Sequence, residues 1–184
     1  MLEVLLIVAL LVLAAWSLHR WWFSGDRGWM PLELRRATLV YAEQLFRAPG
    51  RPMITAKVDR VYRRRDGRLV LVELKTRRIN LAYLSDVIEL SAQRVAIGSE
   101  TGEDVMAHAY VVVQGPAGRR TTHKVKLLGA EEVRGLASRR EAILAGTTRP
   151  RLAGAPGLRE RCAFEKKCAV ASALSKNTYK HLPS

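Results

Sequence analysis

Residues 53–75 read MITAKVDRVYRRRDGRLVLVELK, and this stretch decides the predicted fold. Residues 53–62 are rich in residue types that suit β-strands, and residues 68–75 contain an apolar run that ends in Glu73-Leu74-Lys75. Between them, Asp66-Gly67 is a strong signal for a two-residue turn. The stretch therefore predicts a β-hairpin.

The sequence on either side predicts helices and further strands. Pro31 suits the first turn of a helix over residues 31–47, which residues 49–52 (PGRP) would end. Apolar residues at helical spacing predict a second helix over residues 81–97, and a third is expected over 130–144. Strands are expected at residues 105–114 and 121–128, joined by a turn at 115–118. This order of elements predicts a mixed α/β domain.

Acidic and basic side chains meet on the predicted hairpin. Because residues two apart on a strand point to the same face, Glu73 and Lys75 stand side by side, and pairing across the hairpin brings Asp59 next to them. Two carboxylates can hold a hard divalent cation such as Mg²⁺, which activates a water and neutralises charge on a phosphate. An ammonium beside them orients or deprotonates that water, or stabilises the transition state. The alternative is a cross-strand charge cluster on a solvated sheet face.

These residues resemble a known family. Val58-Asp59 followed by Glu73-Leu74-Lys75 is similar to the D…(D/E)-x-K core of the PD-(D/E)XK nuclease superfamily, in its RecB-like and CRISPR-adaptation branches, with Val58 in place of the proline. The resemblance implies a restriction-endonuclease-like core, in which helices flank a central mixed sheet. It also implies that Asp59 and Glu73 bind Mg²⁺ or Mn²⁺, with the Leu74 carbonyl as a candidate further ligand, and that Lys75 is catalytic with them.

The resemblance adds two candidate site residues. RecB-like members often carry an acid on the first helix and a glutamine on the next one, within Q-x-x-x-Y. Glu43 is the candidate for the acid, as a metal ligand, and Gln93 matches the glutamine, which orients groups in the site. Ile97 stands where the tyrosine would be. The ordinary alternatives are a helical ion pair between Glu43 and Arg47, and a solvated Gln93 on a polar helix flank.

The chain is strongly basic. Its 184 residues include 31 Lys and Arg against 17 Asp and Glu, a formal net charge of +14, and the charges of Glu3 and Arg20 cancel within residues 1–23. Such a surface attracts polyanions, so DNA is the expected partner, and anionic lipid is the alternative. The candidates for nucleic-acid contacts are five arginines near the hairpin and the second helix: Arg63, Arg64, Arg77, Arg78 and Arg94.

The first residues predict a membrane anchor. Residues 4–18 are apolar and carry no charge, and residues 2–22 as a helix would span about 30 Å, the thickness of a hydrocarbon core. Basic residues follow this run, so the positive-inside tendency places the rest of the chain in the cytoplasm, on a single-pass anchor in the inner or plasma membrane. A cleaved signal peptide, and hence a secreted nuclease, is the alternative.

The predicted organisation is an anchor (1–23), a linker (24–30), a nuclease-like domain (31–148) and a basic tail rich in Pro and Gly (149–184). Cys162 and Cys168 resemble the end of CRISPR-adaptation nucleases that hold a [4Fe–4S] cluster with four cysteines. Two thiolates are too few for that cluster, so none is expected. The predicted function is metal-dependent cleavage of DNA. A non-catalytic tether that binds DNA or anionic lipid through the same basic surface is the alternative.

Overall fold

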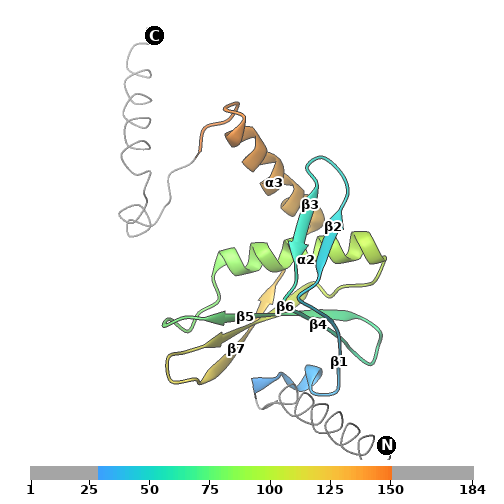
Figure 1. Ribbon diagram of the computed structural model, residues 1–184, viewed down its shortest axis with the longest axis vertical. Coiled ribbons are helices and arrows are strands. Elements are labelled where there is room, and N and C mark those ends of the chain that lie inside the picture. Colours follow the sequence, from blue (N-terminus) through green and yellow to red (C-terminus); the bar gives the residue numbers. More distant parts are fainter. Residues whose placement is uncertain (1–28, 151–184) are drawn as a thin grey trace, which may run out of the picture. The chain divides into compact units, whose positions relative to one another are not determined.

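The computed structural model of the chain describes residues 29–150 (Figure 1). The predicted anchor at 1–23, most of the predicted linker, and the tail with Cys162 and Cys168 lie outside the described residues. Within residues 29–150, no helix is long and apolar enough to cross a membrane. The chain divides into two compact units, Met1–Ser138 and Arg139–Ser184, and the sheets and the candidate site lie in the first.

The largest element of the fold is a five-stranded sheet with the order β1-β4-β5-β6-β7. Its strands are β1 (Thr38–Ala42), β4 (Arg60–Arg63), β5 (Leu69–Thr76), β6 (His108–Gln114) and β7 (Arg120–Lys126). Strands β5 and β6 pair in parallel and the other neighbours pair antiparallel, so the sheet is mixed. A separate antiparallel pair consists of β2 (Leu45–Ala48) and β3 (Ile54–Lys57). The prediction of a mixed α/β domain with a mixed sheet is confirmed.

Two α-helices, α2 (Leu84–Thr101) and α3 (Ala130–Leu144), and the 3₁₀-helix η2 (Leu32–Leu34) complete the described chain. Helix α2 lies across one face of the sheet, where its Leu90 and Ile97 pack with Leu69 and Leu71 of β5 (Figure 1). On the opposite face, Leu34 of η2 packs in a second apolar cluster with other side chains of β5. Side chains alternate along a strand, so the odd-numbered residues of β5 point toward α2.

Residues 38–48 and 54–63 form one bent antiparallel ribbon. β1 pairs with β4 and β2 pairs with β3. At the bend between the two pairs, the Glu43 N–H donates to the Asp59 carbonyl at 3.1 Å and the Val58 N–H donates to the Gln44 carbonyl at 2.9 Å. On one side of the bend the ribbon belongs to the large sheet, and on the other side it runs beside α2 (Figure 1). The bend therefore places Asp59 where the ribbon leaves the sheet.

The predicted helix over residues 31–47 is wrong. Only Leu32–Leu34 is helical, and the remainder forms β1 and β2. Apolar residues at helical spacing in this segment favoured a helix, but the segment also follows a period of two: Phe46 and Ala48 are buried, whereas Leu45 and Arg47 are exposed. Residues 49–52 connect β2 to β3 and do not end a helix.

The predicted strand over residues 53–62 is also wrong as one strand, because it breaks at Val58-Asp59 into β3 and β4. The hairpin itself is confirmed, with Arg60 opposite Val72 and Arg63 opposite Leu69. Its connection spans residues 64–68 and is longer than the predicted two-residue turn, with Gly67 in the left-handed region. The second and third helices and the two later strands are confirmed, with shifted ends for all but α3.

Candidate active site

The candidate site is built where the end of β5 faces α2. Three alternate positions of this strand and its extension pair in turn with three side chains of the helix, each within hydrogen-bond distance. The pairs are Glu73 with Gln93 at 3.1 Å, Lys75 with Glu89 at 2.8 Å, and Arg77 with Asp86 at 2.8 Å. We call these three contacts the strand–helix ladder. Arg77 keeps the strand alternation because its N–H donates to the Gln114 carbonyl of β6 at 3.2 Å, one residue beyond β5.

Glu73 is the buried acid of the site, with 3% of its surface exposed. Gln93, which is 2% exposed, donates from Nε2 both to Glu73 Oε2 and to the Lys57 carbonyl, the latter at 3.0 Å. Burial raises the pKa of the Glu73 carboxyl, and the negative charges of Asp59 and Glu89 raise it further, against the hydrogen bonds from Lys75 and Gln93. The interpretation of Gln93 as a solvated glutamine is therefore wrong.

Lys75 lies between two carboxylates. Its Nζ is 2.6 Å from Glu73 Oε1 and 2.8 Å from Glu89 Oε2. Burial lowers the pKa of the Lys75 ammonium, but the hydrogen bonds to the two carboxylates outweigh burial and raise this pKa above its ordinary value. Lys75 is therefore a fixed cation at neutral pH in this arrangement. The predicted side-by-side placement of Glu73 and Lys75 is confirmed.

Asp59 reaches the same place from the bend of the ribbon. Its Oδ2 accepts a hydrogen bond at 3.0 Å from the backbone N–H of Leu74, the residue between Glu73 and Lys75. The buried neighbour Val58 anchors the bend in the apolar core beneath α2. Pairing across the hairpin therefore brings Asp59 beside Glu73 and Lys75, as the sequence predicts.

Glu43 lies beside Asp59 along the backbone but not on a helix. It occupies the bend between β1 and β2 with a φ of 54°, in the left-handed region. Its carboxylate is 2.5 Å from the Lys57 ammonium, and its side chain is 66% exposed. The structure thus pairs Glu43 with Lys57, whereas the backbone N–H of Arg47 donates to the Glu100 carboxylate.

The charge of the site favours a bound cation. Glu73 and Glu89 place two carboxylates against the Lys75 ammonium, and the Asp59 carboxylate accepts from the backbone N–H of Leu74, between Glu73 and Lys75. Among residues 29–150, no group of three or more His, Cys, Asp or Glu side chains that could hold a metal ion is found, and Glu43 as a third ligand stays a prediction. Mg²⁺ needs only one or two carboxylates, together with waters and substrate phosphates. Asp59 and Glu73 fit that smaller requirement.

The five candidate arginines separate along β5. Arg77 and Arg78 follow this strand directly, next to Lys75. Arg63 and Arg64 lie at the other end of the hairpin, where Arg63 pairs with Glu103, and Arg64 is 3.5 Å from Glu33. Leu69 to Lys75 spans about 20 Å of strand, so this second group lies far from the carboxylates.

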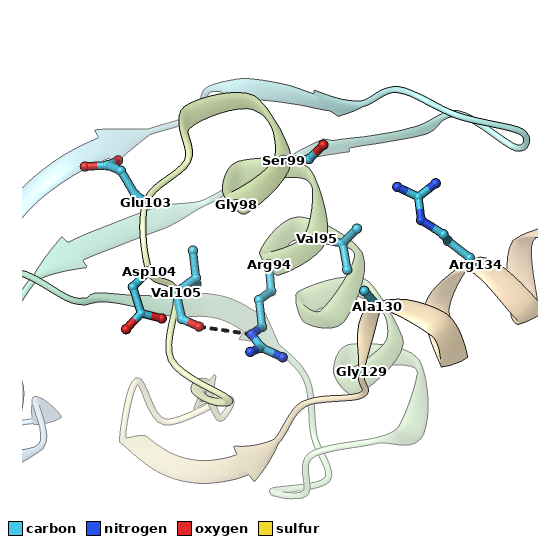
Figure 2. Close-up of a pocket in the computed structure, with 10 residues that line it drawn as sticks. All are labelled: Arg94, Val95, Gly98, Ser99, Glu103, Asp104, Val105, Gly129, Ala130 and Arg134. Atoms are coloured by element: carbon cyan, nitrogen blue, oxygen red, sulfur yellow. Dashed lines mark hydrogen bonds between the residues drawn. The ribbon is translucent and has the colours of Figure 1, made fainter.

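Arg94 belongs to that distant group. Its Nε donates at 3.0 Å to the carbonyl of Val105, which pairs with Leu69 at the start of β5. Figure 2 shows this contact in a pocket of about 530 Å³ whose lining also includes Glu103, Asp104 and Arg134. The pocket therefore lies at the opposite end of β5 from Glu73 and Lys75.

Two residues of the ladder were not singled out as site residues. Glu89 stands four residues before Gln93, a spacing that places both on neighbouring positions of one helix flank. Asp86 lies on the same flank, three residues before Glu89, and is buried beside Arg77. The spacing of Asp86, Glu89 and Gln93 was visible in the sequence, but an exposed polar flank has the same pattern, so the sequence did not reveal their partners.

Comparison with known proteins places the chain in no family. No family model matches the sequence, and no curated protein matches it significantly. Among solved structures, the chain is similar to the crystal structure of SSO0001, with a TM-score of 0.48 and 17% sequence identity over 86% of this chain. The matched region covers 66% of that chain, slightly less than two thirds of its length. The class of protein that can be stated, a mixed α/β protein, rests on the chain's own sheets and helices.

Proposed function

We propose that the chain is a nuclease of the PD-(D/E)XK type that hydrolyses phosphodiester bonds in DNA with Mg²⁺ or Mn²⁺, on a restriction-endonuclease-like core. The observation that supports this proposal best is the convergence of Asp59, Glu73 and Lys75 at one end of β5. A surplus of carboxylates at this point of a chain with a net charge of +14 attracts a divalent cation, and Arg77 and Arg78, which directly follow β5, attract the phosphates.

In the proposed mechanism, each side chain has one task. Asp59 and Glu73 hold the cation, which when bound would neutralise charge on the phosphate and lower the pKa of an attacking water. Lys75 orients that water or stabilises the negative charge that develops on the phosphate. Gln93 keeps Glu73 Oε2 engaged, so Oε1 is the oxygen on the side of Lys75. The proposal does not require Glu43 as a ligand.

The test is cleavage of labelled single- and double-stranded DNA by the full chain in mild detergent, with Mg²⁺, Mn²⁺ or EDTA. We expect metal-dependent cleavage that falls about 10³-fold in Asp59→Asn and in Lys75→Ala, because each removes a group that acts on the reacting phosphate. Asp66→Asn and Lys126→Ala, on exposed surface away from the site, are matched controls that should keep the wild-type rate.

Two outcomes would contradict the proposal. Equal cleavage by wild type, Asp59→Asn and Lys75→Ala would place the activity elsewhere. Tight, salt-sensitive binding of DNA without cleavage under any metal condition would favour the non-catalytic tether, which depends on the basic surface alone.

We also propose that the nuclease is held on the cytoplasmic side of the inner or plasma membrane by residues 1–23. The apolar run at 4–18 and the basic residues that follow it support this location. The mass of the mature chain tests it. An intact N-terminus in the membrane fraction agrees with an anchor, whereas loss of the apolar run would identify a cleaved signal peptide and a secreted protein.

A further inference from the structure

Within residues 29–150, the aromatic ring of Tyr83 follows the candidate site along the chain. Residues 29–150 contain six Phe, Trp and Tyr side chains, and Tyr83 is the exposed one among them, at 39% of its surface. It lies just before α2, on the loop that follows β5. The segment that carries Lys75 therefore leads directly to this ring.

Arg77 and Asp86 hold the Tyr83 ring in place. The Arg77 guanidinium lies 4.6 Å from the ring centroid and donates to Asp86 Oδ2 at 2.8 Å. The same Asp86 oxygen accepts the Tyr83 N–H at 2.8 Å, and Asp86 is buried. A guanidinium that is paired with Asp86 thus lies over the ring, and Tyr83 as a whole keeps 39% of its surface exposed.

Helix capping does not explain a tyrosine at this position. Tyr83 occupies the N-cap of α2, where Ser, Thr, Asp or Asn is preferred because a short side chain caps the free N–H groups. Here Tyr83 makes no side-chain cap hydrogen bond. The Asp86 carboxylate caps the start of the helix by accepting the Tyr83 backbone N–H, so the cap does not require the aromatic ring of Tyr83.

We propose that Tyr83 is a base-stacking platform. An unpaired nucleobase stacks on its ring while a phosphate of the same nucleic-acid strand lies at Asp59, Glu73 and Lys75. This inference rests on the proposed nuclease function. Two residues of extended chain place Arg77 about 7 Å beyond Lys75 in the direction of β5. The Tyr83 ring stacks on the Arg77 guanidinium and so lies about the same distance beyond Lys75. A nucleic-acid strand that leaves the carboxylates along this line passes Lys75 and reaches the ring at the step of Arg77.

The neighbouring exposed side chains Ile79, Leu81 and Leu84 suggest a lipid surface as the competing occupant. Nucleic acid is favoured because the ring is next to the candidate site and is backed by a cation. Bases of any sequence stack on such a ring, and Arg adds a cation–π contribution. A bilayer, in contrast, has no need of an aromatic group fixed by a buried ion pair.

The experiment measures binding and keeps it separate from cleavage. Fluorescence anisotropy in EDTA would follow the full chain with labelled oligothymidylate, the same strand with abasic sites, and a blunt duplex. The variants are Tyr83→Ser, which removes the ring and supplies a good N-cap, and Tyr83→Trp, which keeps a ring. Leu84→Ser is the matched control, since Leu84 is 70% exposed in the adjacent position.

We expect Tyr83→Ser to bind oligothymidylate about tenfold more weakly, the size of one base–aromatic stack, while Tyr83→Trp and Leu84→Ser bind like wild type. All variants should bind the abasic strand and the duplex equally. Unchanged affinity of Tyr83→Ser for oligothymidylate would overturn the platform, as would an equal loss on the abasic strand. Binding to anionic phosphatidylglycerol vesicles that falls in both Tyr83→Ser and Leu84→Ser, with strand affinity unchanged, would overturn it in favour of lipid.

The proposed function fails by a different result. Ring-dependent binding of the strand with no metal-dependent cleavage would overturn the nuclease and leave the platform intact. Cleavage that is lost in Asp59→Asn but shows no dependence of strand binding on the ring would overturn the platform alone.

Discussion

The two faces of the five-stranded sheet each carry a charged cluster, and the clusters differ in which sign is in excess. Beneath α2, Glu73 and Glu89 contact the Lys75 ammonium, and Asp59 bonds to the backbone N–H of Leu74 beside them. On the opposite face, four side chains contact the Glu33 carboxylate, and we call this group the Glu33 cluster. They are His108 at 3.2 Å, Tyr110, Lys124 at 3.5 Å and Arg64 at 3.5 Å.

This difference separates a structural contact from a candidate binding site. In the Glu33 cluster, donors occupy the oxygens of a single carboxylate, so this carboxylate has no free hydrogen-bonding position for a ligand. Its contacts hold the start of the domain against the sheet. In the strand–helix ladder the three carboxylates of Glu73, Glu89 and Asp86 outnumber the two cations Lys75 and Arg77, and a further positive charge would stabilise the buried Glu73 carboxylate. The sheet thus uses the same residue types for stability on one face and for proposed chemistry on the other.

The largest effect is expected from a change of Glu73, the buried acid of the candidate site. Glu73→Gln should lower metal-dependent cleavage about 10³-fold, roughly 4 kcal/mol of transition-state stabilisation, because the amide cannot hold the cation. The amide fills the same volume and still accepts from Gln93, so circular dichroism and thermal melting should show a folded chain. Steady-state cleavage rates at saturating Mg²⁺ provide the measurement.

Glu33→Gln is the matched control for that variant, with the opposite expectation. It should keep the cleavage rate but lower the free energy of unfolding by about 2 kcal/mol, since charged hydrogen bonds to Glu33 are lost. Urea unfolding would measure this loss. A cleavage defect in Glu33→Gln as large as that in Glu73→Gln would remove the distinction between the two faces.

A smaller effect sharpens the comparison within the ladder. Glu89→Gln removes one of the two carboxylates that position the Lys75 ammonium, and a modest misplacement of this group should lower the cleavage rate about tenfold. Glu100→Gln, on the same helix but bonded to the Arg47 N–H, is the control and should be neutral for cleavage. Equal rates for wild type and Glu89→Gln would mean that Glu73 alone positions Lys75.

The smallest effect concerns acid stability at the other end of the sheet. Hydrogen bonds from Tyr41 and Arg63 hold the pKa of Glu103 below its ordinary value of 4.5, with burial opposing them. A lowered pKa in the folded state adds stability above pH 4.5 that is lost as pH falls through the folded pKa. Urea unfolding across this range should show a shallower loss in Glu103→Gln than in wild type. An identical pH dependence would contradict the assignment.

The sequence predicted the parts of the fold that depend on local patterns. The position of the hairpin connection around Asp66-Gly67, though not its length, and the helices α2 and α3 follow from turn chemistry and helical spacing. The bent ribbon did not, because the break at Val58-Asp59 is caused by contacts with Gln44 and Glu43, far away in the sequence. The same limit applies to the site. The i, i+2 rule placed Glu73 beside Lys75, whereas Glu89 and Asp86 became site residues only through long-range packing of α2 on β5.

The strand–helix ladder also fixes how α2 can move. A slide of the helix by one turn relative to β5 would break the contacts at Glu73, Lys75 and Arg77 together, and each would leave a charged or buried polar group without its partner. We therefore expect the helix and the strand to open as one cooperative unit. Their amide hydrogens exchange with solvent through the same opening, and faster exchange throughout α2 and β5 would be the signature of a broken rung.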